Sequence, residues 1–267
     1  MSAVFIWNVL LAFLVGGAWV AASTLAADRF GSRVGGFIAA LPSTVVVALF
    51  FIGWGQGLDA AVRAAGIVPL SFANTGLFLL WFTLLAKRRF GRPLAAALFL
   101  WFVFATAIVF FRPAHLAPSV AIYLLTAAAS WLVFRRLDFS GGAGQAHRHH
   151  SAAVVAIRAL FGGVLVAASV VLSKVAGPLF GGISAAFPAV FLSSLFFGYR
   201  EHGLSFAKAM AVAMWRIGIV AIPAFALAAW ALYRPWGLAG GTLGAIGVSA
   251  ILALVDLELQ HRSRGTS

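Results

Sequence analysis

The segment Gly35-Gly-Phe-Ile-Ala-Ala-Leu-Pro42 recurs as Gly181-Gly-Ile-Ser-Ala-Ala-Phe-Pro188, at an offset of 146 residues. Both copies place a glycine pair shortly before a proline, inside a long apolar stretch. Self-similarity at one fixed offset indicates an internal repeat. The same offset pairs Gly16-Gly17 with Gly162-Gly163, Ala22-Ser23 with Ala168-Ser169, Gly31 with Gly177, and Gly57-Leu58 with Gly203-Leu204. The chain is therefore predicted to contain two copies of one unit.

The composition around this repeat is typical of a membrane protein. Of the 267 residues, 63% are hydrophobic and 9% are charged, whereas a soluble domain has roughly a quarter of its residues charged. The apolar side chains cannot all fit inside a water-soluble core, so lipid must solvate most of them. The apolar runs are about 20 residues long and do not alternate, which favours helices over a β-barrel. The predicted fold class is an all-α polytopic membrane protein.

Nine transmembrane helices are predicted from these apolar runs. They cover roughly Val4–Ala26, Gly35–Trp54, Gly66–Leu85, Pro93–Phe111, Ala117–Phe134, Val154–Val175, Gly181–Tyr199, Ala211–Leu232 and Gly237–Leu257. Most connections are short. The longest, residues 135–153, is rich in glycine and histidine and is typical of a flexible loop.

The basic residues predict the orientation of the chain. With the N-terminus outside, 13 of the 19 Lys and Arg residues fall in cytoplasmic segments and four in outer connections. Cytoplasmic loops carry such an excess, so the N-terminus is predicted outside and the C-terminus in the cytoplasm. The net charge of +13 is therefore assigned to topology and lipid headgroups rather than to nucleic acid. Because the chain has no cysteine, disulfides and thiolate metal sites are excluded.

The repeat and the span count together predict a four-plus-one-plus-four plan. Residues 1–112 form repeat 1, residues 113–150 form a linker helix and a cytoplasmic loop, and residues 151–267 form repeat 2. A unit with an even number of spans, followed by one linker helix, enters the membrane upside down relative to its copy. Inverted repeats of this kind are a transporter architecture with the site near the midplane. They also occur in dual-topology channels, so they narrow the function without fixing it.

The second unit resembles a known family. It contains Leu172-Ser-Lys174, Gly181-Gly182, Ala186-Phe-Pro188, Gly203, Ala213-Met-Trp215 and Ile222-Pro223. This series is similar to that of the GlpM-like family of small four-helix bacterial inner-membrane proteins, over about 90 residues and more faintly in the first unit. The first unit departs from it, with Ala27-Asp28 in place of Ser173-Lys174 and no Met-Trp pair. The resemblance implies a fused, diverged pair of four-helix units in the bacterial inner membrane. It implies no defined activity.

The two repeated prolines are the first candidate site residues. Pro42 and Pro188 each remove a backbone hydrogen bond and disfavour helical geometry in the preceding residue. A helix broken at mid-membrane exposes amide groups that can bind an anion or a polar group. Ser43 and Thr44 would add hydroxyls beside the first break, and Ser184 precedes the second. The alternative is a simple kink, or close packing of helices at the small residues.

Three further residues are candidates because they are polar within apolar spans. Arg216 follows Lys208 deep enough into the eighth span that its charge is costly, and such charges usually face a cavity or a partner. It could instead snorkel to the headgroups. Ser71 and Asn74, with Thr75, form a polar patch in the third span. Such a patch can line a polar pathway or join helices by hydrogen bonds.

Several function classes are disfavoured by what the sequence lacks. The six acidic residues lie at or near membrane boundaries, which argues against proton antiport through a carboxylate within the membrane. No phosphate-binding loop, paired core carboxylates or nucleophile with its base is present, so no enzyme activity and no cofactor are predicted. The loop histidines His147, His149 and His150 are interpreted as part of a solvated loop rather than as metal ligands, and no metal site is predicted.

Together these observations predict a transporter of the inner membrane that moves a small anionic or polar solute, a lipid-linked one included, by alternating access. The predicted substrate-binding residues are Pro42, Ser43, Thr44, Ser71, Asn74, Ser184, Pro188 and Arg216. The alternatives are a passive small-ion channel and a non-transporting accessory subunit of an envelope or lipid-handling complex. The predicted partners are membrane lipids and a small solute or ion, with the chain acting as a monomeric pseudo-dimer or as a homodimer.

Overall fold

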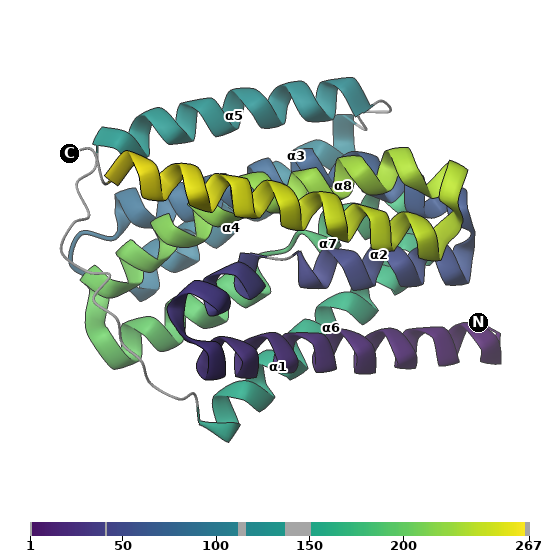
Figure 1. Ribbon diagram of the computed structural model, residues 1–267, viewed down its shortest axis with the longest axis horizontal. Helices are drawn as coiled ribbons and strands as arrows, with labels where there is room; N and C mark the ends of the chain where they lie inside the picture. The colour runs from purple at the N-terminus through teal and green to yellow at the C-terminus, as the bar shows by residue number, and fades with distance from the viewer. Residues whose placement is uncertain (1, 41, 112–115, 137–150, 265–267) are drawn as a thin grey trace.

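The computed structural model of the chain describes residues 2–40, 42–111, 116–136 and 151–264, with the backbone alone for residues 26–40, 201, 217, 257 and 259–264. The described residues form helices and no strand (Figure 1). In chain order these are α1 (Ala3–Ala40), α2 (Ser43–Gln56), α3 (Leu58–Leu85), α4 (Gly91–Phe111), α5 (Leu116–Arg136), α6 (Ala152–Ala176), α7 (Pro178–Ala185) and α8 (Ala189–Arg264). The predicted all-α class is confirmed.

Seven helical stretches of the described chain are long and apolar enough to cross a membrane. They are Ala3–Leu25, Leu58–Leu85, Gly91–Phe111, Leu116–Arg136, Ala152–Ala176, Pro178–Arg200 and His202–Asp256. The last is 55 residues long, far more than the roughly 20 that one crossing requires. The helices therefore suit a multi-pass membrane protein.

The predicted count of nine spans is not confirmed. The span expected at Gly35–Trp54 is divided between the end of α1 and α2, and α2 has only 14 residues. The spans expected at Ala211–Leu232 and Gly237–Leu257 lie within one apolar stretch of α8. The 14-residue α2 is too short for a full crossing, and the helical run His202–Asp256 turns at Gly237, between the two spans expected there.

Two glycines divide α8 into three helical segments. Gly203 (φ 83°) and Gly237 (φ 68°) have positive φ inside it, a conformation that costs L-residues with a Cβ atom free energy. Figure 1 shows the C-terminal part of α8, drawn in yellow, folding back after the second of these turns. The beginning of α1 and the end of α8 consequently lie at opposite ends of the molecule.

The turn at Gly203 has a counterpart at the same offset as the sequence repeat. Gly57, 146 residues earlier, joins α2 to α3 with φ 92° and ψ 160°. Gly203 has φ 83° and ψ −174°. In both places a short helix that starts just after a proline ends at a glycine in the same unusual conformation.

α1 and α6 cross at their glycine pairs, where the contacts are reciprocal. A methyl group added to Gly16 would lie 2.8 Å from Cγ2 of Val166, and one added to Gly162 would lie 2.5 Å from Cγ2 of Val20. Each glycine thus receives a valine of the other helix, and both glycines and both valines are 146 residues apart. Such i-to-j and j-to-i contacts characterise an isologous, two-fold interface.

The buried core is centred on α3, which packs against α2, α4, α5, α7 and α8. In its apolar window 83% of the residues are buried, against 17% in α5 and 22% in α4. One core cluster joins Leu49 of α2 to Phe225 and Tyr233 of α8. A second joins Phe82 of α3 to Leu195 of α8. The peripheral helices expose large apolar side chains, as lipid-facing helices do.

α5 forms hydrogen bonds beside prolines of two neighbouring helices. Pro69 lies inside α3, and the amide of the next residue, Leu70, donates to Oγ of Ser119 at 3.1 Å. Pro223 in α8 has no N–H for the carbonyl of Ile219, four residues earlier. The hydroxyl of Tyr123 donates to that carbonyl. α5 therefore forms hydrogen bonds with backbone groups beside prolines in both halves of the chain.

Candidate functional site

Two helix interruptions occur at the repeated prolines. α1 ends at Ala40 and α2 begins at Ser43, with Pro42 (φ −75°, ψ 57°) before its first residue. α7 ends at Ala185 and the next helical segment begins at Ala189. At the second interruption the chain leaves α7 through short turns, in which Ala186 N–H donates to Ile183 and Phe187 N–H to Ser184. Pro188 itself has no N–H to continue the helix.

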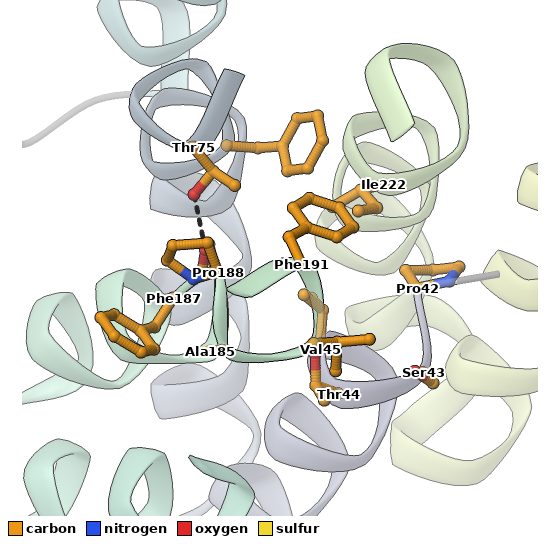
Figure 2. Close-up of a pocket in the computed structure, with 13 residues that line it drawn as sticks. Pro42, Ser43, Thr44, Val45, Thr75, Ala185, Phe187, Pro188, Phe191 and Ile222 are labelled. Atoms are coloured by element: carbon orange, nitrogen blue, oxygen red, sulfur yellow. Dashed lines mark hydrogen bonds between the residues drawn. The ribbon is translucent and has the colours of Figure 1, made fainter. Parts of the chain in front are cut away.

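Both interruptions line one cavity of about 60 Å³ (Figure 2). Its wall is made by Pro42, Ser43, Thr44, Val45, Phe72, Thr75, Ala185, Ala186, Phe187, Pro188, Val190, Phe191 and Ile222. A water molecule needs about 10–15 Å³ of such space, so the cavity has room for a few waters or one small solute. Segments that are far apart in sequence, from α2, α3, α7 and α8, meet here.

The cavity lies at the start of two helices. The first amides of a helix have no acceptor within it and carry partial positive charge. Ser43 and Thr44 belong to the first turn of α2, and Val190 and Phe191 to the first turn of α8, and all four line the cavity. Two helix N-termini thus converge on the same space. This arrangement favours a negative charge or an electron-rich oxygen between them.

Thr75 of α3 forms a hydrogen bond with the interruption between Ala185 and Ala189. Its Oγ1 donates to the carbonyl oxygen of Ala186 at 2.7 Å, a bond drawn in Figure 2. The same oxygen accepts a hydrogen bond from Nε1 of Trp101, in α4, at 3.1 Å. Asn74 reinforces this link, because its Nδ2 donates to the carbonyl of Trp101 at 2.9 Å. Thr75 is 1% exposed, so these bonds hold the interruption from within the core.

Phe187 separates the cavity from an aromatic group on α4. Its ring lies edge-on to Trp101 at 5.0 Å and tilted to Phe102 at 5.9 Å between centroids. In Figure 2 this ring points away from Pro42, whereas Phe191 lies between the two interruptions. The cavity therefore has an inner aromatic wall at Phe191 and a side wall at Phe187.

Four of the predicted site residues line this cavity. Pro42, Ser43, Thr44 and Pro188 were expected near separate helix breaks, and the structure brings them together. Ser184, the third hydroxyl residue predicted at the helix breaks, does not line it. The Ser184 hydroxyl donates back to the carbonyl of Phe180 at 2.6 Å, within its own helix.

The remaining candidates lie elsewhere. Ser71 is fully buried and donates to the carbonyl of Ile67 in its own helix at 3.1 Å. Asn74 is 3% exposed and joins α3 to α4 rather than lining the cavity. Arg216 is exposed and does not line it. The polar patch of the third span therefore acts mainly through Thr75.

The apolar wall of the cavity could not be predicted from the sequence. Phe72, Phe191 and Ile222 line the cavity but are common in apolar spans, so no motif distinguishes them. Phe72 contacts α8 at Gly218, where an added methyl group would lie 2.6 Å from Cζ of Phe72.

No group of three or more His, Asp or Glu residues in the described ranges could hold a metal ion. His147, His149 and His150 lie outside the described residues. The groups available at the cavity are hydroxyls, backbone amides and aromatic rings.

Comparison with known proteins gives one family match. A family model described as "Protein of unknown function (DUF3147)" matches residues 9–114. The matched part spans α1 to α4 and therefore contains Pro42, Thr44 and Thr75. No curated protein and no solved structure was found to match the chain.

Proposed function

We propose that this protein is a membrane transporter whose substrate site is the cavity between the two interrupted helices. The observation that carries the proposal is that the repeated prolines, 146 residues apart, line one cavity. In transporters built from inverted repeats, the site lies between the repeats and is formed by discontinuous helices. The seven apolar helical stretches supply the membrane-spanning framework.

The two halves are proposed to be inverted copies. Support comes from the reciprocal contacts of Gly16 with Val166 and of Gly162 with Val20. Further support comes from the matched backbone turns at Gly57 and Gly203. On this view the chain is a fused pair of GlpM-like units, joined by α5, in a bacterial inner membrane with the N-terminus outside. The opposite positions of the two chain ends in Figure 1 fit an odd number of crossings.

The proposed substrate is a small anion or a small neutral polar solute. Two helix N-termini face the cavity, and their partial positive charges favour an anion. Hydroxyls of Ser43 and Thr44 can donate to it. The volume of about 60 Å³ limits the bound group to a few non-hydrogen atoms. The charge of Arg216 is not needed at the site, because that residue is exposed elsewhere.

Transport by reconstituted protein tests the proposal. Purified protein in liposomes is loaded with chloride, acetate, phosphate or glycerol, and the uptake of labelled external solute is followed. A carrier gives saturable uptake that is accelerated when the same solute is inside. Discrete single-channel current steps in planar bilayers would instead establish a passive pore. Absence of both uptake and current for every solute would leave the accessory-subunit alternative and overturn the proposal.

Substitution at the cavity links the activity to this site. Thr44→Val removes a hydroxyl and keeps the shape. A hydrogen bond to a charged group contributes about 1.5–3 kcal/mol, so the half-saturating anion concentration should rise roughly 10- to 100-fold. Thr83→Val is the matched control, because the Thr83 hydroxyl donates only to Leu79 of its own helix, at 2.7 Å. Equal effects of the two variants would place the site elsewhere.

A further inference from the structure

A second, larger hollow lies beside the cavity, between α4 and α6. Its volume is about 510 Å³. Its lining is Trp101, Phe102, Ala105, Thr106 and Val109 of α4, Leu165, Ala168 and Leu172 of α6, and Phe180, Ile183, Ser184 and Phe187 at α7. We call it the lateral groove. Both helices that border it expose large apolar side chains, including Phe102 (51%) and Leu172 (39%), so it lies on a lipid-facing side.

The lateral groove offers an occupant apolar surface and no free hydroxyl. Only two of its lining side chains, Thr106 and Ser184, have hydroxyl groups. Thr106 donates to the carbonyl of Phe102 at 2.8 Å, and Ser184 donates to that of Phe180 at 2.6 Å. Since both hydroxyls are satisfied within their helices, a polar ligand would lose hydrogen bonds on entering. The surface is suited to a hydrocarbon chain.

Phe187 joins the lateral groove to the cavity. It is the one residue that lines both spaces. The two spaces also adjoin along the end of α7, where Ile183 and Ser184 line the groove and Ala185 and Ala186 line the cavity. Rotation of one half-buried aromatic ring could therefore connect an apolar channel from the bilayer with two helix N-termini.

We propose that the solute is a single-chain amphiphile, a long-chain carboxylate, with its hydrocarbon chain in the lateral groove and its carboxylate in the cavity. This inference rests on the function proposed above and names its substrate class. The size of the cavity decides the headgroup, because about 60 Å³ accepts a carboxylate but not a glycerophosphate or a sugar. The amphiphile reaches the lateral groove from the bilayer, and its carboxylate passes Phe187 to enter the cavity.

Because the chain has no cysteine, a single one can carry a probe. Ala168→Cys, in the groove wall, and Ala128→Cys, exposed on α5, are each labelled with a fluorophore in the full-length protein in liposomes. Stearic acid with a nitroxide on its chain is added as quencher. We expect saturable quenching at position 168, at least fivefold stronger at low mole fraction than the linear quenching at position 128. Unlabelled stearate should relieve it, and methyl stearate should not.

Two groove-filling variants test the assignment from opposite walls. Ala105→Phe, on α4, and Leu165→Trp, on α6, are each introduced into the protein labelled at position 168. Each substitution should abolish the saturable part of the quenching. Linear quenching at position 168 in the protein without a groove-filling substitution would overturn the inference. Equal relief by stearate and its methyl ester would overturn it too, because the carboxylate would then not be recognised. Acetate uptake is measured with the same protein, without a groove-filling substitution. This measurement tests the proposed transport function separately from the binding of the long-chain carboxylate.

Discussion

At the scale of single residues, Thr75 organises the site. One hydroxyl accepts from Trp101 of α4 and donates to Ala186, whose carbonyl lies in the interruption before Pro188. Because α7 ends at Ala185, the carbonyl of Ala186 has no donor from a continuing helix, and a carbonyl left buried without a partner costs free energy. Thr75 supplies that partner. The interruption is thereby held open in one geometry rather than left to collapse onto the cavity.

Thr75→Val is expected to lower both stability and transport. The variant keeps the side-chain shape but leaves Nε1 of Trp101 and the Ala186 carbonyl without this partner, which should cost about 1–3 kcal/mol. Thermal unfolding in detergent measures the loss, and uptake in liposomes measures its effect on the site. Thr83→Val is equally buried but has no bond to another helix. If both variants unfold at the same temperature, Thr75 does not fasten the interruption.

At the scale of helices, two pairings define the molecule. α1 meets α6 through glycines that admit the neighbouring backbone. Small residues at such crossings let helices approach closely within a membrane. α5 contributes differently, because Ser119 and Tyr123 form hydrogen bonds with backbone groups near Pro69 and Pro223. One pairing depends on the absence of side chains and the other on polar ones.

Gly163→Ala should separate α1 from α6. The added methyl group would lie 2.6 Å from the backbone oxygen of Phe13, which cannot move without its helix. Overpacking of this kind costs about 1–3 kcal/mol, seen as a lower unfolding temperature. Gly247→Ala is the control of opposite sign. No atom lies within 4 Å of the new methyl group there, and alanine stabilises a helix by about 0.5–1 kcal/mol relative to glycine.

Tyr123→Phe tests the bonding role of α5. Loss of the hydroxyl leaves the carbonyl of Ile219 unsatisfied beside Pro223, so the unfolding temperature should fall by the equivalent of about 1–3 kcal/mol. Tyr199→Phe provides the comparison, because the ring of Tyr199 stacks on Phe90 at 4.2 Å and the variant keeps that ring. A variant at Tyr123 as stable as one at Tyr199 would show that α5 is held by apolar packing alone.

At the scale of the whole molecule, the helical class could be predicted from the sequence. An interruption at each repeated proline was one of two predictions, a simple kink or close packing being the other. Which side chains share a space could not be predicted. Pro42 and Pro188 have local effects on the backbone that follow from their chemistry. Arg216 and Asn74 are different, because hydropathy gives the depth of a residue and not the face of the helix it occupies. In helices that are apolar on every side, the facing direction is set by tertiary packing.

The proposed topology predicts that the two chain ends are on opposite sides of the membrane. Since the chain has no cysteine, Ser2→Cys and Ser263→Cys give single labelling positions. A membrane-impermeant maleimide applied to intact cells with a permeable outer membrane should label position 2. Position 263 should react only after the inner membrane is opened. Labelling of both positions from the same side would require an even number of crossings.

The convergence of two helix starts at the cavity has a consequence for identifying the solute. Each helix start carries about half a positive charge, so when no ligand is present the two ends repel each other. An anion between them converts this repulsion into attraction and should raise the unfolding temperature. A ligand at 100 times its dissociation constant stabilises the folded state by about 2.7 kcal/mol. The resistance of the protein to heat is therefore a means of sorting candidate solutes before any flux is measured.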